Sequence, residues 1–472
     1  MFKNCFLFSL SRKTMKEFLK THEVEIGIFV GALLLRLAIF FVLLAISSPT
    51  GFSLPFAGSD SISYLDAARE LGETGRFLDR ETGLPNSYEV PGYPLFLALI
   101  KKLGGGPLAA AIVQDVIAAA SAVMMYKIGA MLAPGVGILA ALLFAVDPAG
   151  VFYSNFILTE TLFIFFVLLA VRLLFAGSRQ KLLAAGLSLG AATMVRPVGE
   201  ILLPGFVGAL AVLHFKERRK IAVLSLIVVL GFFVVAGPWF VRNKLLFDRW
   251  ELSSVASLQF AFAHAPLYYA YKNNVPAREA INIFHARLLA ISPYGGEASL
   301  RNSPFMWQVA FEYLREDPVG FAKFHAIKTI PFFLSDGLRE MAARADIIPN
   351  SMPSLGDLAM KRDFAGLWGI LQENKTALLL FAGGAAFWFL VNAFMLIGIT
   401  FGLGTRGQRL ALVLLSAFIV FATALVAGGA VSHPRYRLGV SPFMFILASF
   451  GLFESIAFLK SRWLNRNVTK TV

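Results

Sequence analysis

Long apolar runs, separated by short polar segments, dominate the chain. About 20 apolar residues are enough to cross a bilayer as an α-helix, because backbone polar groups in lipid must be hydrogen-bonded within their own segment. The pattern therefore predicts an all-α polytopic membrane protein, a bundle of about ten or more transmembrane helices with outer juxtamembrane helices and a small external segment. The predicted spans are 25–47, 107–131, 134–150, 159–177, 181–196, 198–214, 220–241, 376–401, 409–430 and 436–459.

Two further apolar stretches are too short or too charged to be spans. The run GYPLFLALI, residues 92–100, is about half a span long and is followed at once by two lysines. We interpret it as a helix that lies on the outer surface of the membrane. Residues 319–337 are apolar but carry two lysines and a histidine. This pattern favours an interfacial amphipathic helix over a span.

The basic residues between the runs predict the orientation of the chain. Lys and Arg clusters favour the cytoplasmic side, and here they precede the first span, fill the loops KERRK and TRGQR, and follow the last span. Placing all of them inside puts both chain ends in the cytoplasm and segment 48–106 outside. The sequence then divides into an N-terminal transmembrane module, 1–241, which includes that first outer loop, an external or interfacial segment, 242–375, and C-terminal transmembrane helices, 376–472.

The composition agrees with a membrane protein and excludes other classes. Of the 472 residues, 57% are hydrophobic and 15% are charged, and the mean hydropathy is +0.70. Soluble proteins have roughly 45–50% apolar and about 25% charged residues. The formal net charge of +14 lies mostly in the short clusters between apolar runs. It therefore reflects membrane orientation, and we expect no nucleic-acid partner. The single cysteine, Cys5, excludes an intramolecular disulfide.

Two acidic residues lie on the predicted outer face. Asp60 stands in GSDSISY after the first span, and Glu160 opens the fourth span in YSNFILTETLF. A loop acid such as Asp60 is more often solvated than catalytic, and Glu160 after Thr159 also suits a helix N-terminus. A third acid, Asp115, lies within the second span, where a charge is costly. We favour a buried hydrogen-bonding role for Asp115 over a functional one.

Positive residues on the same face oppose the inside bias. They are Arg196 in MVRPVGE, Arg242 in VRNK, and His433, Arg435 and Arg437 in HPRYR. Contact of long side chains with lipid headgroups explains each of them separately. An anionic ligand explains them together, because the planar guanidinium fork matches phosphate. Acids and arginines on one face indicate a substrate that has a phosphate and a hydroxyl group.

These segments resemble the GT-C superfamily of integral-membrane glycosyltransferases, in particular the branch of dolichyl-phosphate-mannose protein mannosyltransferases and 4-amino-4-deoxyarabinose lipid A transferases. The resemblance is carried by GSDSISYLDAAR, PGYPLFLALI, YSNFILTETLFIFF, MVRPVGEILLP, WFVRNKLLFD and HPRYRLGVSPF, which follow the order of the family over nearly the whole chain. It implies transfer of a sugar from a polyprenyl-phosphate-linked donor to an acceptor hydroxyl or phosphate on the outer face, with inversion at the sugar carbon. It also implies that 1–241 is the catalytic module.

The resemblance further implies roles for single residues. Asp60 matches the first-loop acid of the family, a general base or acceptor-orienting group, and Glu160 matches the second acid, which is linked to a divalent cation or to the acceptor. Both are therefore candidate ligands of Mg²⁺ or Mn²⁺. The implied donor-phosphate contacts are Arg196, Arg242, Arg435 and Arg437, and the implied substrate contacts are Tyr64, His433 and Tyr436. No motif anchors a further acid or histidine of the outer segment, for which His264 and Glu297 are available.

The expected partners are a polyprenyl-phosphate-sugar lipid, membrane lipids, and an acceptor that is an envelope glycolipid, a polysaccharide, a lipid or a protein. We expect the protein in a bacterial inner membrane, with its site on the periplasmic face. Two other classes stay open, a lipid or drug transporter (flippase) and a non-catalytic scaffold. A transporter would place ionisable residues deep in several spans. The deep candidates are few, chiefly Arg36, Asp115 and Lys127, which favours the transferase.

Overall fold

The computed structural model describes residues 22–46, 59–79, 82–335 and 375–468, together with residues 337, 365, 366, 368 and 369. Cys5, the start of the predicted outer loop and residues 338–364 of the outer segment lie outside the described residues. Helices make up most of the described part, where the extended backbone is limited to one bridge between Leu78 and Pro85. The predicted all-α fold is confirmed.

Every predicted span contains a helix. The N-terminal ones are α2 (Glu23–Ile46), α5 (Pro107–Gly129), α6 (Pro134–Val146), α7 (Pro148–Ser154), α8 (Glu160–Leu174), α9 (Arg179–Val195), η1 (Pro197–Leu202), α10 (Leu203–Leu213) and α11 (Arg218–Phe247). The C-terminal ones are α20 (Lys375–Leu403), α21 (Gly407–Ala427) and α23 (Ser441–Val468).

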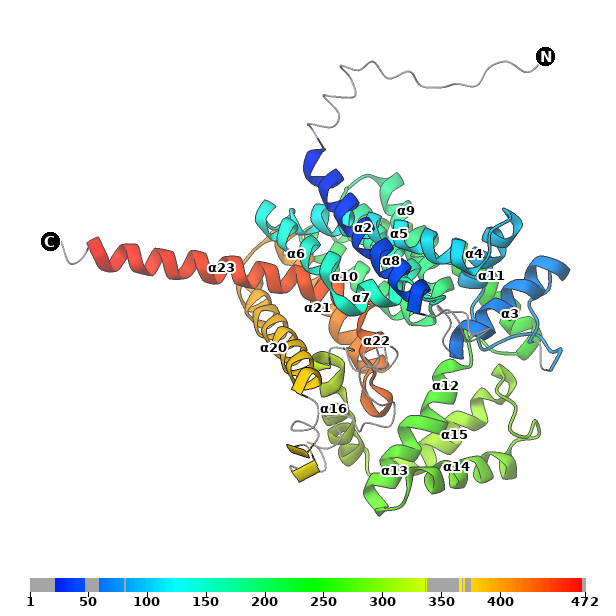
Figure 1. Ribbon diagram of the computed structural model, residues 1–472. Helices are drawn as coiled ribbons and strands as arrows, with labels where there is room; N and C mark the ends of the chain where they lie inside the picture. Colours follow the sequence, from blue (N-terminus) through cyan, green and yellow to red (C-terminus); the bar gives the residue numbers. More distant parts are fainter. Residues whose placement is uncertain are drawn as a thin grey trace, which may run out of the picture.

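Six of these helices, α2, α5, α11, α20, α21 and α23, are long and apolar enough to cross a membrane, and the bent pair α6 and α7 would make a seventh span. The chain is thus an integral membrane protein. The shorter α8 and α9 pack within the bundle, where α9 lies against both α8 and α11 (Figure 1). These two helices are shorter than the six long ones.

The bend between α6 and α7 has a local cause. Pro148 begins α7, and the Asp147 side chain caps that helix by accepting a hydrogen bond from the Gly150 amide at 3.1 Å. The two helix axes differ by 57°. Because α7 changes direction, the following turn carries the chain to Glu160 at the start of α8.

Glycines allow α9 and α11 to pack backbone against backbone. A Cβ atom on Gly186 would lie 2.1 Å from the carbonyl oxygen of Val228, and one on Gly231 would lie 2.5 Å from that of Leu183. Any larger residue at either position would push the helices apart. Such close contacts are common among helices in lipid, where van der Waals packing takes the place of the hydrophobic effect.

Two helices precede the bundle core on its outer side. They are α3 (Ser59–Thr74) and α4 (Gly92–Lys102), which pack against each other. The expected helix at 92–100 is present as α4, and its 11 residues are too few to cross a bilayer. These two helices bring the first outer loop, with Asp60, to the end of the bundle.

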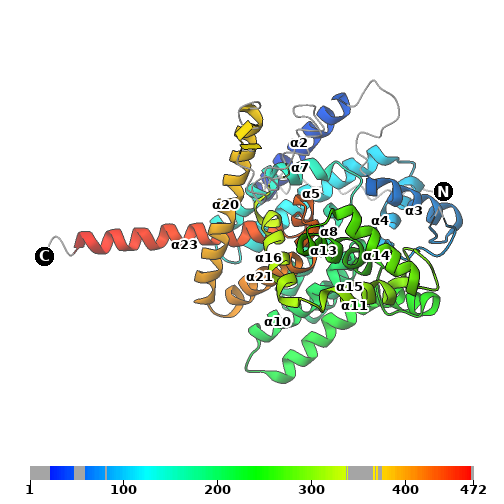
Figure 2. The same cartoon turned by 90° about the horizontal axis from the view of Figure 1, so that it is seen from below.

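A second helical unit lies beyond the bundle and has its own core (Figure 1). Its elements are α12 (Val255–Gln259), the π-helix η2 (Phe260–His264), α13 (Ala265–Asn273), α14 (Ala277–Ile291), η3 (Leu300–Asn302) and α15 (Ser303–Leu314). The expected amphipathic helix at 319–337 is α16 (Pro318–Leu334), which packs on both η4 (Gly429–Val431) and α22 (Pro434–Arg437). In the view from below, α13, α14 and α15 of this unit lie nearest the viewer, beside α16 (Figure 2).

Candidate functional site

Four charged residues from distant parts of the sequence meet at one end of the bundle. Arg435 on α22 donates from Nη1 to Asp60 Oδ2 at 2.7 Å and from Nε to Glu160 Oε1 at 2.5 Å. Arg196, which caps the C-terminal end of α9, places its Nη1 atom 2.6 Å from the same Glu160 oxygen. Asp60, Arg435, Glu160 and Arg196 thus form a series of alternating charges, called the ionic chain below.

The two acids of the ionic chain differ in their access to solvent. The Glu160 side chain is 3% exposed and lies between two guanidinium groups, whereas the Asp60 side chain is 46% exposed. Burial alone would lower the pKa of Arg435, but Glu160 and Asp60 raise it far above its usual value. Arg435 is therefore a permanent cation. The Asp60 side chain is thus accessible from outside the protein although it is paired with Arg435, and the buried Glu160 contacts both arginines.

Buried side chains fix the turn that leads to Glu160. The Gln114 amide donates from Nε2 to the carbonyl oxygens of Ser154 and Phe156, at 3.0 and 2.6 Å, and its Oε1 accepts from the Tyr93 hydroxyl at 2.6 Å. Gln114 and Tyr93 are fully buried. An unpaired amide or carbonyl in this environment would be costly. These bonds therefore hold the turn in one position, and with it the start of α8.

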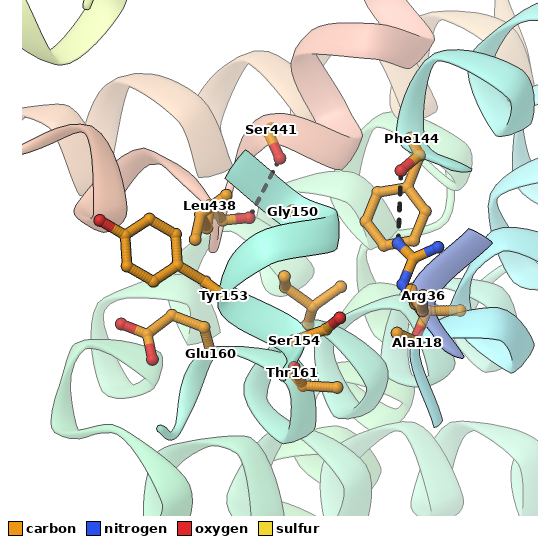
Figure 3. A pocket seen from close by; sticks show the side chains of 12 residues that line it. Arg36, Ala118, Phe144, Gly150, Tyr153, Ser154, Glu160, Thr161, Leu438 and Ser441 are labelled. Atoms are coloured by element: carbon orange, nitrogen blue, oxygen red, sulfur yellow. Dashed lines mark hydrogen bonds between the residues drawn. The ribbon is translucent and has the colours of Figure 1, made fainter. Parts of the chain in front are cut away.

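A small cavity lies behind Glu160 (Figure 3). Its volume of about 20 Å³ is room for one water molecule. Asp115, beside it, accepts a hydrogen bond from Ser154 Oγ at 2.8 Å, which confirms its expected buried hydrogen-bonding role. Arg36, which lies across the cavity from Glu160 in Figure 3, donates to the carbonyl oxygens of Phe144 at 3.5 Å and Ala145 at 3.4 Å. Two of the deep charged residues that a transporter would use thus have partners in the packing of the bundle.

The three predicted substrate contacts lie near the ionic chain, with different environments. Tyr64 on α3 packs edge to face against Tyr93, with ring centroids 5.1 Å apart, and burial raises the pKa of its hydroxyl. Tyr436 and Arg196 both line a second, larger cavity, which is distinct from the small one behind Glu160. His433 instead caps α22, because its Nδ1 accepts from the Arg435 backbone amide at 3.2 Å. Its contact is with the backbone that positions Arg435.

Two predicted phosphate contacts lie outside the ionic chain. Arg437 is 1% exposed, its guanidinium carbon is 3.4 Å from the centre of the Trp388 ring, and its Nη1 donates to two carbonyl oxygens at the end of α16, at 3.0 and 3.2 Å. Arg242 lies 4.3 Å from the centre of the Trp239 ring and donates to Asn243. This geometry gives both arginines a packing role, and their contact with phosphate stays a prediction.

The acids do not form a ligand set for a metal ion in this arrangement. Within the described ranges, no three His, Cys, Asp or Glu side chains gather closely enough to hold one. Both Asp60 and Glu160 are paired with Arg435, whereas Mg²⁺ and Mn²⁺ favour several oxygen ligands. The predicted cation at Asp60 and Glu160 does not fit these residues as they lie, and no step below depends on one.

A larger cavity opens beside the ionic chain, with a volume of about 480 Å³. This is within the range of about 300–1,000 Å³ that is usual for small-molecule sites. Arg196 and Tyr436 form the wall nearest the ionic chain. His264, one of the two unanchored candidates of the outer segment, also lines the cavity, and the sequence did not point to the lining residues Glu200, Trp250, Glu251, Phe260 and Trp307. They are spread over more than 100 positions, and no motif connects them.

No family model and no curated protein matches the chain by sequence. Among solved structures, the chain is similar to the apo oligosaccharyltransferase of Archaeoglobus fulgidus, with a TM-score of 0.50 and 12% identity over 94% of this chain and 52% of that one. Archaeal oligosaccharyltransferase AglB from the same organism, in complex with an inhibitory peptide and a dolichol-phosphate, gives a TM-score of 0.49 at 14% identity, over 96% and 52% of the two chains. ArnT from Cupriavidus metallidurans, bound to undecaprenyl phosphate, gives 0.36 at 14% identity, over 90% and 77%.

The first of these similarities defines the fold. This chain shares the all-helical membrane fold of that oligosaccharyltransferase over 94% of its own length. The chain spans about half the length of the Archaeoglobus fulgidus oligosaccharyltransferase. Because one fold can support several activities, the reaction has to be argued from the site.

Proposed function

We propose that the protein is a membrane glycosyltransferase that moves a sugar from a polyprenyl-phosphate-linked donor to a hydroxyl-bearing acceptor, with inversion. The observation that supports this most is the ionic chain: the accessible carboxylate of Asp60 contacts Arg435, and Glu160 links Arg435 to Arg196, which lines the larger cavity. A carboxylate can accept the proton of a hydroxyl group, and guanidinium groups can hold a phosphate. The reaction needs both.

Asp60 is the proposed general base. The acceptor hydroxyl oxygen forms a bond to the anomeric carbon of the donor sugar while its proton passes to an Asp60 oxygen. The bond between that carbon and the phosphate oxygen breaks on the opposite face, and its electron pair leaves with the polyprenyl phosphate. General-base catalysis of this kind contributes typically about 10²–10⁴-fold.

Arg435 and Arg196 are the proposed phosphate contacts. Negative charge grows on the phosphate as the glycosidic bond breaks, and cations already in position stabilise it without reorganisation. Each guanidinium carries five N–H donors, and the printed contacts of Arg435 with the acids use Nε and Nη1. Glu160 contacts both arginines. Its proposed role is to orient them, and not to transfer a proton.

The site lies at the end of the bundle opposite the basic loops. Helix α9 begins at Arg179 and ends beside Arg196, and α21 begins next to Arg406 and leads to α22. By the positive-inside rule the basic ends are cytoplasmic. The proposed location is therefore the periplasmic face of a bacterial inner membrane, where an envelope glycolipid, polysaccharide, lipid or protein would be the acceptor.

The proposed catalytic module is not complete within residues 1–241. This part supplies Asp60, Glu160 and Arg196, but Arg435 comes from the C-terminal helices and the wall of the larger cavity comes partly from the outer segment 242–375. The three-part division of the chain stays a proposal. All three parts contribute to the proposed site.

Reconstitution tests the proposed reaction. Purified protein in liposomes is given polyprenyl-phosphate sugars and total envelope lipid or polysaccharide as acceptor, and release of free polyprenyl phosphate is measured. We expect release that depends on the acceptor. Movement of the donor between leaflets without release would support a flippase instead. Profiling of radiolabelled lipids in a deletion strain then identifies the acceptor.

Cysteine labelling tests the proposed orientation. Cysteines replace the exposed residues Arg76, Asn273 and Gln408, one at a time, after Cys5 has been changed to Ser. We expect an impermeant thiol reagent to label the first two in intact cells. The cysteine at 408 should react only after permeabilisation. The opposite pattern would place the ionic chain on the cytoplasmic face.

A further inference from the structure

The larger cavity combines aromatic walls with acidic side chains. Phe260 and Trp307 are in contact, with ring centroids 5.0 Å apart, and Phe163, Trp250 and Tyr436 also line the cavity. Aromatic faces pack well against the C–H groups of flat organic rings. These walls come from the bundle and from the outer helical unit, so that they are brought together only by the fold.

The charges in the cavity are mainly negative. Glu200 and Glu251 are the two acidic residues among the described residues that line it. Glu251 accepts a hydrogen bond from Ser303 Oγ at 2.6 Å. Among the described residues that line the cavity, Arg196 is the only Lys or Arg, and it contacts Glu160 at 2.6 Å.

The histidine of the cavity adds no positive charge near neutral pH. His264 is 2% exposed, and burial together with the neighbouring His325 lowers its pKa to about 4. An anionic group placed between Glu200 and Glu251 would therefore lie beside two acidic side chains, whereas Arg196 is the only Lys or Arg among the described lining residues. Repulsion between unit charges a few ångström apart is about 1–4 kcal/mol near a protein surface, which is enough to exclude such a group.

An acyl or prenyl tail is also a poor occupant. Hydrocarbon against Glu200 and Glu251 would bury two acidic side chains and offer neither of them a hydrogen-bond donor, and burial of an unpaired polar or charged group costs several kcal/mol. A sugar ring avoids this cost. Each carboxylate can accept hydrogen bonds from two or more hydroxyl groups, while the C–H face of the ring contacts Trp307 or Trp250.

We propose that this cavity binds a sugar ring without negative charge, and that Glu200 and Glu251 determine this specificity by excluding anionic sugars. The inference rests on the proposed function, because the cavity shares Arg196 and Tyr436 with the region of the ionic chain. The ring belongs either to the donor or to the acceptor. In both cases its hydroxyl groups face Glu200 and Glu251, and its reacting end faces Asp60.

A binding experiment that needs no turnover tests the proposal. The full chain in lipid nanodiscs is titrated with matched neutral and anionic probes, and intrinsic tryptophan fluorescence is measured. Polyprenyl-phosphate-linked glucose and glucuronate represent the donor, and octyl glucoside and octyl glucuronide represent the acceptor. We expect one pair to bind with at least about tenfold preference for the neutral probe. The pair that shows it identifies the source of the ring.

The double substitution Glu200→Gln and Glu251→Gln should remove most of this preference by improving binding of the anionic probe. Each Gln keeps an oxygen acceptor, so that the Ser303 contact is retained. Glu279→Gln, at an exposed position on α14 outside the cavity, is the matched control and should leave the preference unchanged. Glu200→Gln alone should give part of the effect if the double variant unfolds.

Two outcomes would overturn the proposal. One is equal binding of neutral and anionic probes in both pairs by the wild-type protein. The other is a preference that survives in the folded double variant. Equal binding of polyprenyl phosphate with and without its sugar would show that the cavity holds the lipid. If the preference is found but no transfer occurs under any condition, the specificity stands and the proposed transferase reaction fails.

Discussion

The two arginines of HPRYR are two residues apart and have opposite environments. Arg435 contacts the carboxylates of Asp60 and Glu160 at one end of the bundle. Arg437 is buried, lies over Trp388 and donates to the carbonyl oxygens at the end of α16. On a helical turn, successive residues are about 100° apart, so that residues i and i+2 point to nearly opposite sides.

This difference shows that a basic motif at a membrane surface is not one functional unit. Arg435 contacts the exposed Asp60 side chain. Arg437 instead joins α22 to α16 and α20, through contacts that any ligand would have to break. Arg242, which also carried the prediction of phosphate binding, is of the second kind, because its guanidinium packs on an indole ring. Substitution of Arg435 or its partner Asp60 should therefore change the kinetics of transfer, whereas substitution of Arg437 should change the stability of the protein.

The largest effect on transfer is expected for Asp60, whose carboxylate contacts Arg435. Asp60→Asn keeps the shape of the side chain and can still accept a hydrogen bond from Arg435, but it cannot take a proton. We expect transfer to fall by about 10²–10⁴-fold, with unchanged thermal stability. Asp66→Asn, on the same helix in an ion pair with Arg69, is the control and should remain active. Normal turnover by the Asp60 variant would remove it from the proposed role.

The next effect is expected on the Arg437 side and concerns stability. Arg437→Ala leaves the Trp388 ring and two buried carbonyl groups without their partner. A desolvated cation–π contact and a charged hydrogen bond are each worth roughly 2 kcal/mol, so that the loss should be about 2–4 kcal/mol. Thermal melting in detergent measures it. A stable Arg437→Ala variant with a raised KM for the donor would contradict the distinction between the two arginines.

A smaller effect is expected for Arg435→Lys, which keeps the charge but not the fork that contacts both acids. A charge-assisted contact is worth about 1.5–3 kcal/mol, so that kcat/KM for the donor should fall by roughly one to two orders of magnitude. Because charge on the phosphate grows during the reaction, kcat should fall as well. If lysine replaced Arg435 without any kinetic change, contact with lipid headgroups would explain this residue.

The smallest effect is expected for Arg242→Ala. Its guanidinium contacts Trp239, Phe247 and the Asn243 side chain, and none of these belongs to the ionic chain. We expect the kinetic constants for the donor to change by less than about threefold, with a loss of stability of about 0.5–1 kcal/mol from the cation–π contact. A tenfold rise of the KM would place a donor phosphate at Arg242 and extend the site.

The sequence by itself determined the elements of this protein. The expected helices at 107–131, 220–241 and 92–100 appear as α5, α11 and α4, because a long apolar segment in lipid has to satisfy its backbone hydrogen bonds internally. The order of the motifs also selected Asp60 and Glu160, which the structure brings to one arginine. What these residues do in catalysis stays a prediction.

Only the tertiary structure decided which residues share a site. Arg435 and Arg437 are alike in the sequence, and the packing of α22 against α16 gives them different partners. The amide of Gln114 and the acids Glu200 and Glu251 carry no local signal at all. Their roles arise because helices from distant parts of the chain place them beside a turn or a cavity. The hydropathy of a segment determines whether it forms a membrane helix. The direction of a side chain depends on the space that the neighbouring helices leave around it.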